Sequence, residues 1–238
     1  NDGQHLRVTV ASDITDNLAT EVTRLRYLFA VDEDPAPAVA HLSQDSLIGD
    51  LVVERPWIRV PRCWDPFETS VRIIIGQQIS VAAASTICGR LTSRLGLRAS
   101  DVSGLNRTFP SAEVLSQADL DGIGLTERRK VTIQTFSRAV AEGIIDFQPS
   151  ENLDEIEKKW CALPGIGPWT AQVSAMRVLG HDDAMPSSDL GILRSINRLT
   201  NNNFSAKELA SRSTIWKPFR SWVAQHLWQA SEVLRSTS

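Results

Sequence analysis

The stretch "LPGIGPWTAQ", Leu163–Gln172, places a proline and two glycines between two helical patterns. Gly165 and Gly167 have no side chain, so their backbone N–H groups can approach a ligand closely and the chain can adopt positive φ. Pro168 suits the first position of the following helix, where a backbone N–H has no partner inside the helix. The remaining free N–H groups and the helix dipole form an anion site that fits a phosphate. By spacing alone, the stretch fits a purely structural turn equally well.

Two further features follow this turn. Trp169 lies directly behind it, at a helix start that is normally exposed, so a large aromatic side chain there needs a partner. Asp189, in "AMPSSDLGILRS", precedes another amphipathic pattern and is interpreted first as a helix N-cap. Ser187 and Ser188 could provide the cap equally well, which leaves Asp189 available for chemistry. A fixed carboxylate beside an aromatic wall can stabilise a developing carbocation.

Tryptophan is frequent, with seven in 238 residues, and four of them lie in the last part of the chain: Trp169, Trp216, Trp222 and Trp228. Trp222 and Trp228 are six positions apart, so they cannot lie on the same stripe of one helix. We expect one of them in the core and the other at a cleft.

The apolar spacing predicts an all-α protein. A strand is expected only in "HLRVTV", residues 5–10, and the polar segment 97–115 is expected to be a loop. Gly76 and Gly96 are expected to end the helices that precede them. The predicted helices cover residues 17–29, 38–42, 65–76, 81–95, 112–116, 126–142, 153–162, 169–179, 189–199, 206–213 and 218–234.

Composition is that of an ordinary globular protein, with 42% hydrophobic and 22% charged residues. No apolar run approaches the roughly 20 residues that a membrane helix requires. The three cysteines are too widely spaced for a disulfide framework or a metal site, which favours a reducing cytoplasm. The net charge is −3, but residues 186–238 hold three acidic against seven basic side chains. This local excess permits contact with phosphates.

Two more segments extend the pattern: "VPRCWDPFETSVRIIIGQQISVAAASTICGRL", residues 60–91, and "WKPFRSWVAQHLW", residues 216–228. Together with the hairpin and Asp189, they resemble the helix–hairpin–helix DNA glycosylases, in the 3-methyladenine DNA glycosylase II (AlkA-like) branch. The resemblance implies two helical subdomains flanking a cleft. One would combine residues 15–66 with 200–238. The other would be residues 67–199, with the helix–hairpin–helix at 153–180. Residues 1–14 would be the remnant of an N-terminal β-rich domain.

The resemblance also assigns roles to residues around the cleft. Asp189 would be the catalytic carboxylate. The base pocket would be lined by Trp169, Trp228 and Val173, the last standing where some relatives have a tyrosine. Gln78 would be the wedge that enters the duplex, although it is polar where wedges can be aliphatic. The hairpin residues expected at DNA are Gly165, Ile166, Gly167 and Thr170, and a Na⁺ or K⁺ ion would bind the backbone carbonyls of Leu163 and Ile166.

The implied activity is excision of alkylated bases of the 3-methyladenine and 7-methylguanine type from duplex DNA, leaving an abasic site. A flipped cationic base stacks well on tryptophan and leaves readily, so no organic cofactor or catalytic metal is expected. Bifunctional relatives have a lysine at the position of Trp169, so strand cleavage is not expected. We expect a monomer that works on bacterial DNA in the cytoplasm, away from membranes. The alternatives are a glycosylase for deaminated or oxidised bases, a non-catalytic DNA-binding protein and a helical protein scaffold.

Overall fold

The structure is a computed structural model that describes residues 7–8, 18–102, 105–148 and 152–236. Twelve α-helices, one 3-10 helix and one two-stranded sheet lie within these residues. The first half of the chain forms α1 (Leu18–Leu28), α2 (Ala36–Leu42), α3 (Gly49–Glu54), α4 (Pro66–Gly76), α5 (Val81–Leu95), β1 (Arg98–Val102), β2 (Leu105–Arg107) and α6 (Ala112–Gln117). The second half forms α7 (Glu127–Ala141), α8 (Leu153–Cys161), α9 (Pro168–Arg177), α10 (Leu190–Thr200), α11 (Ala206–Arg212), the 3-10 helix (Ser213–Trp216) and α12 (Arg220–Ser236).

The predicted helical fold is confirmed, and local side chains explain where the helices begin. An N-cap side chain accepts a hydrogen bond from a first-turn backbone N–H, which satisfies a donor that the helix itself leaves free. The N-caps that do so in α4 to α8, α10 and α11 are Asp65, Ser80, Ser111, Thr126, Asn152, Asp189 and Ser205. Ser205 also forms a complete capping box, because the side chain of Glu208 accepts a hydrogen bond from the backbone N–H of Ser205.

The expectation of no strand after residue 10 is wrong. β1 and β2 pair antiparallel, with Arg98 opposite Arg107 and Val102 opposite Leu105, and they connect α5 to α6 in the segment predicted as a loop. The strands are too short and polar to show an apolar alternation, so their backbone pairing has no signature in the sequence. The helix α3 was also not predicted, because its 6 residues are too few to show a helical apolar spacing. The predicted strand at residues 5–10 lies, apart from Arg7 and Val8, outside the described residues.

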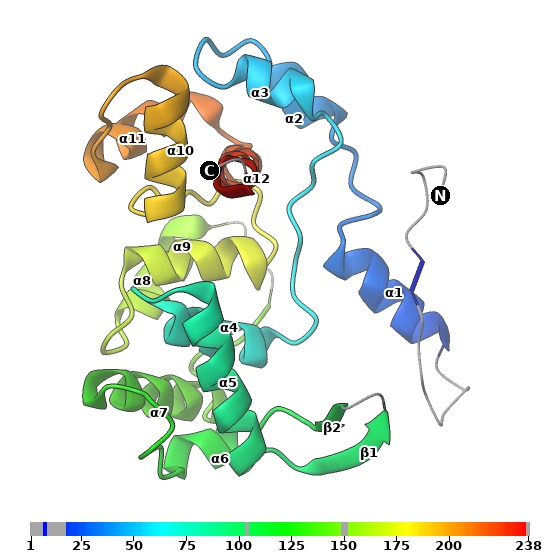
Figure 1. The fold of residues 1–238 in the computed structure, drawn as a ribbon, viewed down its shortest axis with the longest axis vertical. Helices are drawn as coiled ribbons and strands as arrows, with labels where there is room; N and C mark the ends of the chain where they lie inside the picture. The colour runs from blue at the N-terminus through cyan, green and yellow to red at the C-terminus, as the bar shows by residue number, and fades with distance from the viewer. Residues whose placement is uncertain (1–6, 9–17, 103–104, 149–151, 237–238) are drawn as a thin grey trace.

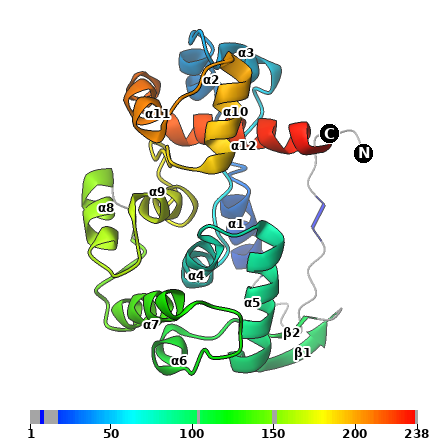
Figure 2. The same ribbon diagram turned by 60° about the vertical axis from the view of Figure 1, so that its left-hand side comes forward.

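Helix α9 lies at the centre of the molecule. Figures 1 and 2 both place it between α10–α12 on one side and α4–α7 on the other, with α8 beside it. The helix pairs with the most extensive contacts are α6 with α7, α10 with α12, α8 with α9, and α4 with α5, α7 and α9. One continuous apolar cluster joins these elements. The predicted division at residue 199 falls near the end of α10, which packs against α12.

The spacing of Leu190, Leu193, Ile196 and Leu199 predicts an apolar stripe on this helix, but the buried face of α10 differs from it. Ile192 and Ile196, one turn apart, are fully buried, whereas Leu190 is 64% and Leu199 is 45% exposed. The sequence offers two overlapping apolar stripes here, and packing against α12 selects the isoleucines. Leu190 therefore stands exposed directly behind Asp189.

No helix in the described part of the chain is long and apolar enough to span a membrane.

Candidate active site

The hairpin between α8 and α9 is held by its own backbone and by α7. The N–H of Ile166 donates to the carbonyl of Leu163 at 3.1 Å, which closes the turn. Gly165 has φ +82°, and a Cβ there would collide with the Oγ1 of Thr132 and lie 3.0 Å from its Cβ. Only glycine therefore fits this position, for two independent reasons: the left-handed backbone and the close approach of α7.

The start of α9 leaves backbone donors open. Gly167 is the N-cap residue and provides no side chain to accept from the first turn. Pro168 follows and has no N–H, so the amides of Trp169 and Thr170 remain for an external acceptor. A Cβ added at Gly167 would meet nothing within 4 Å. The structure thus has an uncapped helix start beside open space where an anion site was predicted.

Asp189 is the N-cap of α10, and its carboxylate accepts four hydrogen bonds. Oδ1 accepts from the backbone N–H of Gly191 at 2.8 Å and of Ile192 at 3.0 Å. The indole N–H of Trp228 donates to the same oxygen at 2.9 Å. Oδ2 accepts from the indole N–H of Trp169 at 3.0 Å. The side chain stays partly exposed, so the carboxylate is fixed in direction without being sealed from solvent.

The tertiary fold thus brings three of the predicted residues together. Trp169 comes from the start of α9 and Trp228 from the middle of α12, and both indole rings point their N–H at Asp189. Both rings are partly exposed, whereas Trp222 is only 4% exposed. Trp222 is therefore the core tryptophan of α12 that we expected, and the position of Trp228 at a cleft stays a prediction. Trp216 is buried as well.

The remaining residue expected in the base pocket, Val173, lies on α9, and so does Arg177, which the sequence did not single out. Val173 follows Trp169 by one turn and is 7% exposed. Arg177, one turn further, places its guanidinium 5.1 Å from the ring centroid of Trp228. The same guanidinium donates to the carbonyl of Pro61 at 3.0 Å and to the Oε1 of Gln225 at 2.8 Å. Arg177 therefore fixes the Trp228 ring against α9, a role that the sequence analysis missed because arginines near helix ends are common.

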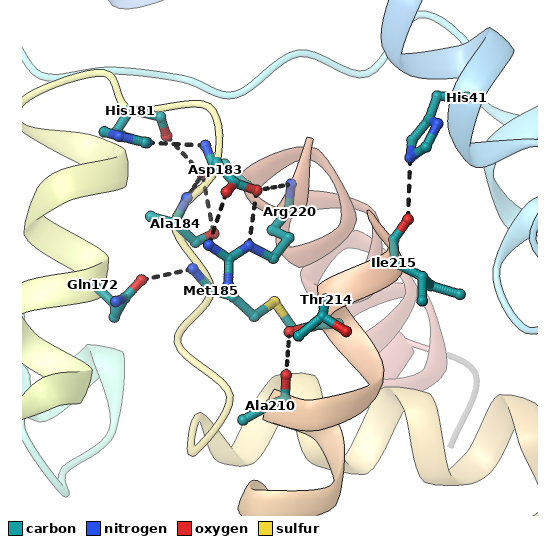
Figure 3. Close-up of polar contacts among 12 residues, drawn as sticks. His41, Gln172, His181, Asp183, Ala184, Met185, Ala210, Thr214, Ile215 and Arg220 are labelled. Atoms are coloured by element: carbon teal, nitrogen blue, oxygen red, sulfur yellow. Dashed lines mark hydrogen bonds and ion pairs between the residues drawn. The ribbon is translucent and has the colours of Figure 1, made fainter. Parts of the chain in front are cut away.

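The loop that carries Asp189 is anchored from both sides. In Figure 3 the guanidinium of Arg220 bonds both carboxylate oxygens of Asp183, each at 2.8 Å. The backbone N–H of Met185 donates to the Oε1 of Gln172, on α9, at 2.8 Å. Ser221 accepts the N–H of Ala184 at 3.0 Å. These contacts hold the segment before α10 to α9 and α12, so the position of the carboxylate does not depend on its own helix alone.

Two glutamines lie between α4 and α5. Gln78 has φ +57° and is exposed, as a residue that contacts a ligand must be. Gln77 turns inward. Its amide donates to the carbonyl of Gly165 at 3.1 Å and to the Oγ1 of Thr170 at 2.9 Å. Thr170 is buried, so its hydroxyl serves this contact while its backbone N–H belongs to the open start of α9. Gln77 was also missed by the sequence analysis, since nothing in "GQQIS" distinguishes the two glutamines.

Metal-binding side chains do not gather here. Among the described residues, no group of three or more His, Cys, Asp or Glu side chains could hold a metal ion.

Residues 71–221 match the sequence profile of the HhH-GPD superfamily base excision DNA repair proteins. The chain belongs to this family. Residues 1–65 match the AlkA N-terminal domain. The HhH-GPD match covers the hairpin, Gln78, Trp169 and Asp189, and it ends within α12 before Trp228.

Named relatives in this superfamily share the resemblance over most of the chain. A Mycobacterium tuberculosis protein named "Probable bifunctional transcriptional activator/DNA repair enzyme AlkA" is 36% identical over 96% of this chain and 46% of its own length. The Escherichia coli "DNA-3-methyladenine glycosylase 2" is 31% identical over 76% of this chain and 63% of its own. The chain thus spans about half to two thirds of the length of these relatives.

Solved structures of the HhH-GPD type share the fold. The Schizosaccharomyces pombe 3-methyladenine DNA glycosylase bound to abasic DNA is 26% identical, with a TM-score of 0.68 over 82% of this chain and 97% of its own. The 3-methyladenine DNA glycosylase from Archaeoglobus fulgidus reaches a TM-score of 0.76 over 93% of this chain and 78% of its own, at 22% identity.

Proposed function

We propose that this protein is a monofunctional DNA glycosylase that flips alkylated bases, of the 3-methyladenine and 7-methylguanine type, out of duplex DNA and hydrolyses their glycosidic bond. The observation that carries the proposal is the partly exposed carboxylate of Asp189, held between the indoles of Trp169 and Trp228. The relatives named as 3-methyladenine glycosylases support the choice of lesion.

The reaction needs little from the protein beyond this arrangement. A base in a duplex must leave the stack before its sugar becomes accessible. A methylated purine carries positive charge, so an indole ring attracts it. When the bond between C1′ and the base nitrogen breaks, its electron pair neutralises the departing base and the positive charge moves to the sugar. Asp189 opposes that charge and orients the water that adds a hydroxyl to C1′, leaving an abasic site and releasing one proton.

Oδ2 of Asp189 is the oxygen suited to face the sugar. Oδ1 is occupied by two backbone amides and one indole, whereas Oδ2 has the single contact with Trp169. Since Trp169 carries no amine, it cannot form a Schiff base with the sugar, and the enzyme would release an abasic site without cutting the strand.

Duplex DNA would be held at the hairpin. Gly165, Ile166 and Gly167 form the turn, and the open amides at the start of α9 would donate hydrogen bonds to a phosphate oxygen. A Na⁺ or K⁺ ion would bind the backbone carbonyls of Leu163 and Ile166. The Leu163 oxygen accepts one hydrogen bond, from Ile166, and a carbonyl has a second lone pair to offer. Bound there, the ion would add positive charge near the phosphate.

The protein would act as a monomer on cytoplasmic DNA.

The decisive test is Asp189→Asn. Asparagine is as good an N-cap as aspartate and still offers one oxygen to Gly191 and Ile192, so the fold should persist. We expect base release from a methylated duplex, measured in single turnovers, to fall at least about 100-fold, because the negative charge that opposes the sugar cation is gone. Affinity for a duplex with an abasic-site analogue should stay within about threefold.

The matched control is Asp65→Asn, which makes the same change at the N-cap of α4, where Asp65 accepts from the N–H of Glu68. It should retain wild-type excision. Full activity in Asp189→Asn would assign the protein to the non-catalytic DNA-binding class. Parallel assays with hypoxanthine and 8-oxoguanine duplexes identify the lesion class, and release of these bases in preference to methylated ones would contradict the proposed substrate.

A further inference from the structure

The side chain of Gln77 makes contacts that have no part in the reaction proposed at Asp189. Its amide nitrogen lies 3.1 Å from the carbonyl oxygen of Gly165 and 2.9 Å from the Oγ1 of Thr170. Gly165 lies in the hairpin turn and Thr170 in the first turn of α9. A single side chain on the loop after α4 thus bonds both parts of the phosphate-binding motif.

The backbone of Gln77 is held from a third side. Arg129, near the start of α7, donates to the carbonyl oxygen of Gln77 at 2.5 Å. The N–H of Gln77 donates to the carbonyl of Ile74 at 3.4 Å at the end of α4. The main chain and the side chain of one residue therefore join α4, α7 and the hairpin.

The next residue is Gln78, which is exposed and has φ +57°. A glutamine in the left-handed region is uncommon and costs about 1 kcal/mol of strain, so the surrounding contacts must hold it there. The peptide bond after Gln77 leads directly into this conformation. The contacts of Gln77 therefore fix the position of the backbone from which Gln78 projects.

We propose that Gln77 is a positioning residue that sets the distance and direction of Gln78 relative to the hairpin, so that phosphate binding and insertion into the duplex occur in one rigid unit. The inference rests on the proposed glycosylase function and on Gln78 entering the duplex. With Gln77 in place, a phosphate bound at α9 brings Gln78 to a defined step of the DNA. Without the contacts of Gln77, the hairpin would still bind phosphate, but Gln78 would no longer be aligned with that step of the DNA.

The test is Gln77→Met, which keeps the length of the side chain and removes its donor. Two hydrogen bonds are lost, so we expect single-turnover excision from a methylated duplex to fall about tenfold. Preference for an abasic-site analogue over undamaged duplex should fall by a similar factor. The fluorescence rise of 2-aminopurine placed beside that analogue should shrink. Binding to undamaged duplex should stay within about twofold, because the backbone amides of α9 are unchanged.

The matched control is Gln134→Met. Gln134 is a partly buried glutamine whose amide donates to the carbonyl of Ala118 at 3.0 Å, in the α6–α7 pair. It should behave as the wild type in all three assays. A second variant, Thr170→Val, removes one of the two acceptors of Gln77 and should reproduce the pattern at about threefold. If Gln77→Met lowers undamaged-DNA binding and thermal stability together with excision, Gln77 is a structural residue and the inference is overturned.

A double-mutant cycle with Gln78→Ala decides whether Gln77 acts through its neighbour. If it does, adding Gln77→Met to Gln78→Ala should cost less than about twofold in excision. Independent tenfold losses that multiply would overturn the inference. Failure of the proposed function is a separate outcome, because the wild-type protein would then release no methylated base. If the wild type is active and Gln77→Met excises methylated bases as well as Gln134→Met does, only the positioning role of Gln77 is overturned.

Discussion

The two oxygens of the Asp189 carboxylate have different partners, and this difference matters at the scale of single residues. Oδ1 caps α10 and accepts the Trp228 indole, whereas Oδ2 accepts only Trp169. The N-cap role and the proposed catalytic role are therefore compatible. Capping aims the carboxylate with one oxygen and leaves the other for the sugar.

The variant Trp169→Phe separates the stacking surface of this side chain from its hydrogen bond to Asp189. Phenylalanine keeps an aromatic face for a base but has no N–H for Oδ2, so the carboxylate loses a directed donor. We expect single-turnover excision to fall about tenfold, because a hydrogen bond to a charged group is worth about 1.5–3 kcal/mol. Binding to an abasic-site analogue should change less than threefold.

The control for this indole-to-phenyl change is Trp57→Phe, at a tryptophan that is 66% exposed and makes no contact with Asp189. It should leave excision unchanged. Equal losses of binding and excision in Trp169→Phe would show that the ring is structural.

His226 is the buried ionisable group nearest to Trp228 in the sequence. It is 1% exposed, and its Nδ1 has no hydrogen-bond partner among the residues that the structure describes. Burial, with a smaller contribution from the positive charge of Arg55, lowers the pKa of His226 from 6.5 to about 4. In the unfolded chain the imidazole binds a proton below about pH 6.5, whereas in the folded protein it stays neutral until about pH 4.

The stability that neutral His226 provides is thus complete above pH 6.5 and is lost as pH falls toward 4. We expect the wild type to lose about 2–3 kcal/mol of unfolding free energy between pH 7 and pH 4.5 beyond what His226→Leu loses. Urea unfolding of both proteins at several pH values measures this difference. If the wild type and His226→Leu lose the same unfolding free energy as the pH falls, His226 is charged or solvated in the folded protein.

At the scale of elements, the two glycines of the hairpin have different tasks. Gly165 has φ +82° and lies against Thr132, whereas Gly167 has φ −110° and faces open space. The first glycine is needed to build the turn and the second to let a ligand approach. The sequence motif makes them look equivalent, and only the packing of α7 distinguishes them.

Gly165→Ala should destabilise the protein by about 2–4 kcal/mol, from backbone strain and the collision with Thr132. Gly167→Ala should change stability by less than about 1 kcal/mol but weaken duplex binding about tenfold, because its methyl group would stand where the phosphate approaches. Chemical denaturation and DNA titration of both variants measure the two effects. Equal stability losses would contradict this division of roles.

At the scale of the whole molecule, a net charge of −3 has to be reconciled with a DNA-binding surface. The acidic excess lies in the first sixty residues, whereas the last fifty-three hold seven basic against three acidic side chains. Over distances beyond a Debye length of about 8–10 Å the acidic part is screened, so local charge at the hairpin and α10 decides binding.

Duplex binding should therefore weaken with salt despite the negative net charge. If two phosphates are neutralised, affinity should fall about tenfold between 50 and 200 mM salt, because each contact contributes a slope of about −0.9 in log–log form. Fluorescence anisotropy of a labelled duplex measures the slope. A flat response would favour the protein-scaffold alternative over a DNA-binding surface.

Much of the helical fold was accessible from the sequence, because helix caps and apolar spacing are local. The predicted helix starts at residues 65, 81 and 126 lie within one residue of the first residues of α4, α5 and α7, and the first two of these helices end at or next to Gly76 and Gly96, as predicted. The β1–β2 pair and α3 were not predicted, since short polar elements leave no periodic signal. The packed face of α10 was also out of reach, because Leu190 and Ile192 are equally apolar and only α12 chooses between them.

The sequence by itself determined the family, the order of the helices and the residues worth testing, because glycine, proline, tryptophan and aspartate each restrict local geometry. It did not determine that both indoles point at one carboxylate, that Arg177 braces Trp228, or that Gln77 rather than Gln78 contacts the hairpin. Those facts depend on contacts between residues 20 to 116 positions apart. Such contacts exist only once the burial of apolar faces has fixed how α4, α7, α9, α10 and α12 cross.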